Sequence, residues 1–258
     1  MLTEAKGIIL RVVDFKETDR LLTVYTEEMG LITVMAKGAR SLKSRKMAAT
    51  QQLCYSSFVI FGEGDKLFVK EASLIESFYS IRDSLDGLAL AMYVAEVVSD
   101  VATADGDSEL LRLVLNTLYA ISKGTYDTDL IKGAFEMRLL SILGFMPELR
   151  ACTRCGASDG EYFFDIMAAA IECRECHKLS EIGGERLAEA HESSIVCIIT
   201  ESARNGLLYS LYAPLEKLFS FKISGEDRQL FSRAAEEYLL HHLERGYKTL
   251  DFYNEVRR

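Results

Sequence analysis

Residues 20–36 read RLLTVYTEEMGLITVMA. Residues 20–26 and 31–36 are rich in β-branched and other apolar side chains, and Glu28-Met29-Gly30 lies between them. Two such runs joined by a short segment that contains glycine are typical of a β-hairpin. The stretch therefore predicts two antiparallel strands.

Similar runs lie on both sides of this hairpin. Residues 7–15, 55–61 and 66–75 have the composition of strands, and a glycine-rich turn at residues 62–65 joins the last two. Five short strands within about 80 residues fit a small closed barrel. We predict an OB-type barrel, with an SH3-like barrel as the alternative.

The connection between the third and fourth strands is basic. From residue 37 to residue 46 it has no acidic residue and five cationic ones: Lys37, Arg40, Lys43, Arg45 and Lys46. Such a loop suits phosphate oxygens, which attract cations whatever the base sequence. We predict that these five residues contact nucleic acid. A loop that is merely solvated is the alternative.

The net charge of the chain is −9, which on its own argues against a nucleic-acid partner. The charge is unevenly distributed, however. Residues 1–80 contain 11 Lys and Arg against 10 Asp and Glu, a balance of +1, whereas the remainder contains 19 against 29, a balance of −10. Because salt screens charges beyond about 8–10 Å, a local basic patch matters more than the total.

From residue 84 the hydrophobic period becomes helical. We predict helices at residues 85–101, 109–122 and 130–143, the third behind Asp129 as its N-cap and before Gly144. Further helices are expected at residues 195–203 and 207–218, with a break at Asn205-Gly206, and from residues 224–227 to Gly246. The larger part of the chain is therefore expected to be helical.

Two Cys-x-x-Cys pairs interrupt the helical part. Residues 150–155 read RACTRC and residues 172–178 read ECRECHK, so that 17 residues (156–172) separate the pairs. This spacing is typical of a tetrahedral zinc site, because each tight turn places two sulfurs on one edge of the metal. We predict that one structural Zn²⁺ ion is bound by Cys152, Cys155, Cys173 and Cys176.

Two disulfides, or four loose thiols, are the alternative for these cysteines, and His177 is an alternative to Cys176 as a ligand. Four thiolates close the coordination shell, so the predicted zinc has no open position for catalysis. A metal-dependent hydrolase or nuclease would need such a position. No nucleophile–base motif or phosphate-binding loop stands out elsewhere in the sequence, and we expect no enzymatic activity.

The sequence also bears on location. Charged residues from Arg11 to Glu17 break any apolar run near the start, and the longest apolar run, residues 88–95, is too short to span a bilayer. Six cysteines fit a reducing compartment. We expect a cytoplasmic protein without a membrane partner.

Together these patterns predict an α+β protein with two domains. Residues 1–80 are expected to form the five-stranded OB-fold barrel and to bind nucleic acid. Residues 81–258 are expected to form an all-helical domain, into which the four-cysteine zinc-binding loop at residues 148–182 is inserted.

Five short motifs follow one another along the chain: GIIL at residues 7–10, DRLLTV at 19–24, KGAR at 37–40, GFMP at 144–147 and GYKTLDF at 246–252. In this order, with the cysteine pairs behind the fourth motif, the chain resembles the RecO family of bacterial recombination mediators. Each motif alone is modest, and their order over nearly the whole chain makes the resemblance specific.

The resemblance implies a DNA repair and recombination mediator whose OB-fold binds single- and double-stranded DNA and promotes strand annealing. It implies RecR and the single-strand-binding protein as partners, with RecA loaded indirectly onto the coated DNA, and a nucleoid-associated location. The acidic net charge departs from the family pattern and suggests more reliance on partners. A zinc-containing protein-interaction adaptor that does not bind nucleic acid is the alternative.

Overall fold

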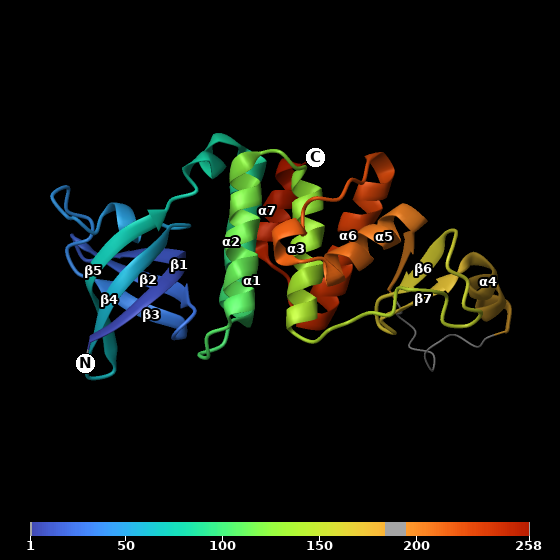
Figure 1. Ribbon diagram of the computed structural model, residues 1–258, viewed down its shortest axis with the longest axis horizontal. Helices are drawn as coiled ribbons and strands as arrows, with labels where there is room; N and C mark the ends of the chain where they lie inside the picture. The colour runs from blue at the N-terminus through green and yellow to red at the C-terminus, as the bar shows by residue number, and fades with distance from the viewer. Residues whose placement is uncertain (1, 184–194, 258) are drawn as a thin grey trace. The chain divides into compact units, whose positions relative to one another are not determined.

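The computed structural model describes residues 2–183 and 195–257, and the chain forms two compact units. Unit 1 consists of Met1–Gly124 together with Tyr247–Arg258, and unit 2 consists of Thr125–Gly246. Figure 1 labels their helices and strands. In the described part of the chain, no helix combines the length and the apolar character needed to cross a lipid bilayer.

Five strands close the barrel of unit 1 (Figure 1). They are β1 (Leu2–Phe15), β2 (Asp19–Thr26), β3 (Gly30–Ala36), β4 (Tyr55–Glu63) and β5 (Lys66–Glu76). The order around the barrel is β1-β2-β3-β5-β4, with β3 and β5 parallel and the other neighbours antiparallel. The predicted five-stranded OB-type barrel is confirmed.

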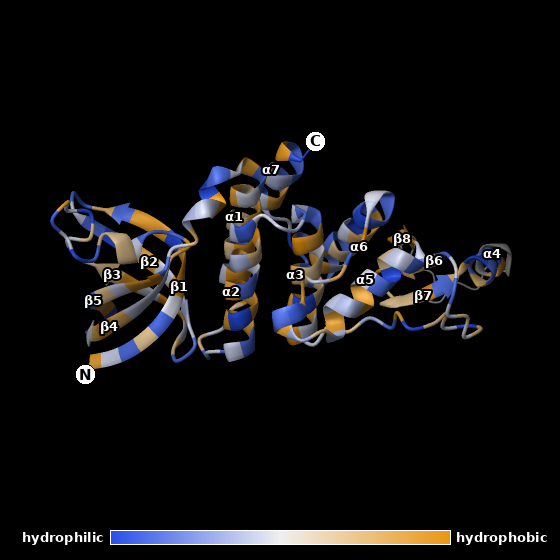
Figure 2. Cartoon of the chain, turned by 45° about the horizontal axis from the view of Figure 1, so that its top comes forward, coloured by the Kyte–Doolittle hydropathy of each residue, from blue (hydrophilic) through white to orange (hydrophobic). Residues whose placement is uncertain are grey.

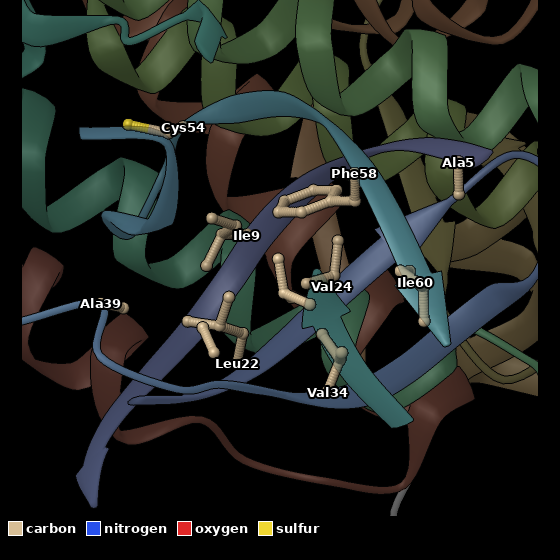
Figure 3. Packing of buried hydrophobic residues seen from close by; sticks show 11 residues of the cluster. Ala5, Ile9, Leu22, Val24, Val34, Ala39, Cys54, Phe58 and Ile60 are labelled. Atoms are coloured by element: carbon tan, nitrogen blue, oxygen red, sulfur yellow. The ribbon is translucent and has the colours of Figure 1, made fainter. Parts of the chain in front are cut away.

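Alternate residues of these strands fill the barrel. Ile9, Leu22, Val24, Val34 and Phe58 belong to this core and are almost completely buried (Figure 3). The ribbon of β1 carries both hydrophilic and hydrophobic colours in Figure 2. Burial of every second residue is what a closed barrel imposes on its strands.

The β2–β3 turn packs closely on the chain that follows the first helix of unit 1. The N–H of Leu31 donates to the carbonyl of Thr103 at 2.9 Å. Gly30 has a φ of 60°, and a Cβ atom there would lie 2.5 Å from the backbone of Ala104. The turn and the close approach both require glycine at this position.

Unit 1 also contains helical segments: η2 (Tyr79–Asp83, a 3₁₀ helix), α1 (Leu85–Val101), α2 (Ser108–Lys123) and α7 (Lys248–Val256). Helix α7 packs on α1, where Tyr247 Oη donates to Asp100 at 2.9 Å and the N–H of Thr249 donates to Glu96 at 3.2 Å. The last residues of the chain therefore belong to the same compact unit as the barrel. The domain boundary at residue 80 stays a prediction.

The helical part of unit 2 consists of α3 (Thr128–Ile142), α5 (Glu201–Tyr212), η3 (Leu215–Lys217) and α6 (Gly225–Leu243). Asp127 caps α3 by accepting from the N–H of Asp129, so the expected cap at Asp129 is wrong by two residues. The expected break at Asn205-Gly206 is also wrong, because α5 continues through it. A Cβ on Gly206 would lie 3.1 Å from the ring of Phe231, so this glycine serves close packing between α5 and α6.

A small sheet completes unit 2. It contains β6 (Tyr162–Asp165), β7 (Ala170–Cys173) and β8 (Val196–Ile199) in the order β7-β6-β8, and α4 (Arg174–Gly183) follows β7 directly. We expected a helix at residues 195–203, but residues 196–199 form the strand β8, so the prediction is wrong there. Three of its four residues are β-branched, and they pair with β6, a long-range contact that overrides the local helical pattern.

Candidate nucleic-acid interface and metal centre

The basic loop runs from the end of β3 to a 3₁₀ helix, η1 (Ala48–Thr50), before β4. Residues 37–47 form successive tight turns. The carboxylate of Asp19 holds the start of the loop by accepting from the N–H of Gly38 at 2.8 Å. This hydrogen bond to the ionised form lowers the pKa of Asp19. The loop is thus tied to the beginning of β2.

Three of the five predicted cations are available to a ligand. Lys43 and Arg45 are exposed, and neither side chain has a hydrogen bond or an ion pair within the described residues. Lys37 is also exposed, with Nζ 4.3 Å from the centre of the Phe68 ring. A cation–π contact of this kind is weak at an exposed site. Each of these cations can approach a phosphate at little cost.

The other two cations have partners on the barrel. Arg40 Nε lies 3.4 Å from Asp14, and its Nη1 donates to the carbonyl of Lys16 at 3.1 Å. Lys46 Nζ donates to the carbonyl of Val69 at 3.4 Å, and burial lowers the pKa of Lys46. Arg40 and Lys46 therefore help to hold the loop on the barrel, in addition to carrying charge.

Arg20 on β2 supports the far end of the loop. Its Nη1 donates to the carbonyls of Met47 and Thr50 at 3.4 and 3.3 Å. Both carbonyls lie outside the strands, and that of Met47 also accepts from the side chains of Thr50 and Gln51. The composition of β2 gives no signal for this role, because the partners lie about thirty residues away in the chain.

The four predicted metal ligands lie together in unit 2. All four Sγ atoms are within 4.8 Å of one another, and those of Cys155 and Cys173 are 3.6 Å apart. Sulfurs at about 2.3 Å from a central Zn²⁺ in tetrahedral geometry lie about 3.8 Å from each other. None of the four cysteines is in a disulfide. The cluster is therefore able to bind one metal ion through all four residues.

Tight backbone turns shape the first cysteine pair. The N–H of Gly156 donates to the carbonyl of Cys152 at 2.9 Å, and Gly156 has a φ of 74°. Burial opposes ionisation of Cys152, but backbone N–H groups, chiefly that of Cys173, outweigh it and lower the pKa of Cys152 to about 6. The thiolate that these donors stabilise is the form that binds a metal.

A second layer of residues surrounds the sulfur cluster. Glu172 is buried and lies 2.8 Å from Arg154 Nε and 3.4 Å from His177 Nδ1. The ring of His177 stacks on that of Phe163, with centroids 3.9 Å apart. His177 faces Glu172 in this arrangement, whereas Cys176 belongs to the sulfur cluster. Spacing alone predicted the cysteines, but it gave no sign that Glu172 connects their two segments.

Comparison with known protein families covers both units. The family model described as Recombination protein O N terminal matches residues 1–78, and the model described as Recombination protein O C terminal matches residues 82–251. The chain belongs to the Recombination protein O (RecO) family. The resemblance suggested by the five sequence motifs is thereby confirmed.

Curated RecO-family proteins align with most or all of the chain. The DNA repair protein RecO of Acetivibrio thermocellus is 34% identical over 258 residues, which cover 99% of this chain and 97% of that protein. The protein of the same name from Caldicellulosiruptor saccharolyticus is 30% identical over 256 residues, or 98% of each chain. That of Bacillus subtilis is 35% identical over 178 residues, or 68% of this chain and 69% of that protein.

Proposed function

We propose that this RecO-family chain is a DNA repair and recombination mediator that acts without enzymatic chemistry. The observation that carries the proposal is the β3–β4 loop, whose exposed cations Lys37, Lys43 and Arg45 lie on an OB-type barrel. The chain's relatives are named DNA repair proteins, which supports the same reading.

In this proposal the loop neutralises phosphates of the DNA backbone. Lys37, Lys43 and Arg45 approach the phosphates directly, while Arg40 and Lys46 add charge from positions where they also brace the loop. Contacts of this kind do not depend on base sequence and accept both single- and double-stranded DNA. Two complementary strands repel each other less once their phosphates are neutralised, so strand annealing is favoured.

Partners complete the proposed activity. With RecR, the chain helps to load RecA onto DNA that the single-strand-binding protein has coated, in the cytoplasm and on the nucleoid. The net charge of −9 supports a role for partners, because it weakens the binding of DNA by the chain alone.

A titration with DNA tests the loop. A labelled single-stranded oligonucleotide is titrated with the full chain at several salt concentrations, and the complementary strand is then added. The double variant Lys43→Glu/Arg45→Glu should reduce the slope of log affinity against log salt by about 1.4, since each lost contact on a single strand contributes about 0.7. It should also slow annealing.

The double variant Lys6→Glu/Lys66→Glu is the matched control, since it reverses two exposed charges of the barrel outside the loop. It should leave the salt slope nearly unchanged. An unchanged slope in the loop variant would refute the loop assignment. No binding by the unaltered chain even at low salt would favour the adaptor alternative, which binds no nucleic acid.

We further propose that the metal ion of the four-cysteine cluster is Zn²⁺ and that it is structural. A tetrahedral set of four thiolates is typical of structural zinc sites, and it leaves no open coordination position. Structural zinc contributes on the order of 10 kcal/mol in small modules. Cys173→Ser should therefore lower both the zinc content and the melting temperature of unit 2.

Cys197→Ser is the matched control for this experiment. Cys197 is a buried free thiol of β8 that lies outside the sulfur cluster. Its replacement should retain the zinc, as measured by elemental analysis. A Cys173→Ser protein with normal zinc content and normal melting would contradict the proposal.

A further inference from the structure

One edge of β5 is largely unpaired. On one side β5 pairs with β4 from Lys66 to Glu76, but on the other side it pairs with β3 only at Leu67 and Phe68. Within the described part of the chain, residues 70–75 have no backbone hydrogen bond on that second side. An open strand edge presents a row of N–H and C=O groups that can pair with another strand.

A cavity of about 660 Å³ runs along this open edge. Five consecutive residues of β5, residues 70–74, line one side, and the end of the basic loop together with η1 lines the other. Ala48, Ala49 and Ala72 lie among the lining residues, and their side chains end at Cβ. Pockets that bind ligands have volumes of about 300–1,000 Å³, and this space lies within that range.

The carbonyl of Val69 shows how the same edge is satisfied just before the cavity begins. Lys46 Nζ reaches it from the loop side at 3.4 Å. The ammonium group of Lys46 thus donates to a carbonyl that would accept from the N–H of a neighbouring strand in a paired sheet. Residues 70–74 lie farther along the same edge, and no side chain in the described part of the chain donates to it there.

The rim of the cavity is cationic. Arg45, Lys46 and Lys70 line it, against a single carboxylate from Glu71. Leu74, which is 42% exposed, adds an apolar surface at one end. An extended segment matches these features when acidic side chains alternate with small or apolar ones, because successive side chains of a strand point to opposite faces.

We propose that a partner protein adds an extended, acidic peptide segment to the open edge of β5 beside residues 70–74. In such strand addition the main-chain hydrogen bonds provide affinity and the alternating side chains provide specificity. A DNA strand suits the cavity less well, since its backbone offers phosphates to the cations but no N–H donors at the spacing of the carbonyls along a strand edge. Because Arg45 and Lys46 belong to both surfaces, peptide and DNA compete there.

A synthetic peptide of alternating glutamate and valine, labelled with fluorescein, serves as the probe for the full chain. Two further peptides carry N-methyl groups on alternate residues, one on the odd and one on the even positions. All three have the same charge. One methylated peptide should bind about tenfold more weakly than the parent, since it loses several main-chain donors, and the other should bind nearly as well.

Two variants outside the basic loop locate the binding site. Ala48→Trp fills the cavity from an exposed position and should abolish peptide binding, while Lys70→Glu should weaken it several-fold. Lys66→Glu, a charge reversal on the same strand outside the cavity, should have little effect. Ala48→Trp should retain the salt slope of oligonucleotide binding, so a failure of this proposal is distinct from a failure of the proposed DNA site.

Hydrogen exchange provides a measurement that needs no substitution. The parent peptide should slow amide exchange within residues 70–75 of the unaltered chain. Equal binding of both methylated peptides and the parent would overturn the proposal. The proposal would also be overturned if an oligonucleotide, but not the peptide, slowed amide exchange at residues 70–75. That result would assign the cavity to DNA. Concentration-dependent dimers that Ala48→Trp removes would also overturn it, by assigning the edge to a second copy of the chain.

Discussion

Arg154 Nε lies 2.8 Å from Oε1 of Glu172, and this ion pair links the two cysteine-bearing segments of unit 2. Arg154 stands between the cysteines of the first pair, and Glu172 directly precedes Cys173. Glu172 is 5% exposed, so water screens the interaction only weakly. The contact therefore holds the two segments in the relative position that the sulfur cluster needs.

Replacing Glu172 by glutamine should weaken metal binding without removing a ligand. The amide keeps the shape of the side chain but loses the charge that pairs with Arg154, beside the ring of His177. Loss of such a supporting residue typically reduces metal affinity by about 10–100-fold. Competition with a chromophoric chelator measures the affinity.

Glu161→Gln is the control for Glu172→Gln, because it removes the more exposed ion pair with Arg174. Its effect should be small, as is usual for surface pairs. If Glu172→Gln bound the metal as tightly as the unaltered chain, the four thiolates alone would fix the site.

Lys43→Ala and Lys46→Ala should affect stability differently, although both remove one loop charge. Lys43 has no partner among the described residues, so its replacement should change the free energy of unfolding by less than about 0.5 kcal/mol. Lys46→Ala also removes the hydrogen bond to Val69, and should cost about 1 kcal/mol. Urea denaturation measures both values. Equal stabilities would show that Lys46 does not help to hold the loop.

The sequence predicted the features that local patterns determine. Runs rich in β-branched and apolar residues with a glycine-containing turn, such as β2 and β3, indicated the barrel, and the spacing of the cysteine pairs indicated the sulfur cluster. Both patterns have short-range causes, since strand composition with a glycine turn and Cys-x-x-Cys turns each act within a few residues.

Features that depend on distant partners were not predicted. Residues 196–199 form a strand because β6 is beside them, and α7 belongs to unit 1 because it packs on α1. The cations of the basic loop also differ in whether they have partners, and those partners are distant in the chain. Arg40 and Lys46 differ from Lys43 only because Asp14 and Val69, far away in the chain, lie within reach. No local pattern records such contacts.

Lys132 is buried between two carboxylates of unit 2. Its Nζ lies 3.1 Å from Glu136 on α3 and 2.8 Å from Glu236 on α6. Burial lowers the pKa of Lys132, but the two carboxylates outweigh this effect and raise it. Lys132→Met would remove the buried cation that Glu136 and Glu236 share, and should reduce the free energy of unfolding by about 3–5 kcal/mol in a urea titration.

The double variant Lys132→Met/Glu136→Leu should recover part of this loss, because it also removes the buried carboxylate. Lys217→Met, at an exposed position of the same unit, is the control and should be nearly neutral. A single variant as stable as the unaltered chain would mean that the ion pair contributes no net stability.

His242 should make the stability of unit 2 depend on pH. Its ring stacks on Phe145 and packs edge-on against Tyr238, and its buried Nε2 has no hydrogen-bond partner within the described residues. Burial, with a smaller contribution from His241, lowers the pKa of His242. Because the folded-state pKa lies below the unfolded value of about 6.5, protonation favours the unfolded state. The contribution of neutral His242 is complete above that value and decreases as the pH falls through it.

His242→Phe should therefore flatten this part of the pH profile, since phenylalanine keeps the aromatic packing and does not titrate. Free energies of unfolding from urea titrations at about pH 7.5 and about pH 5.5 bracket the range in which histidine changes charge. The loss of stability between these pH values should be smaller in His242→Phe than in the unaltered chain. His241→Gln should keep most of the pH dependence, because burial is the larger cause of the shift. The same pH dependence in His242→Phe and the unaltered chain would place the titrating group elsewhere.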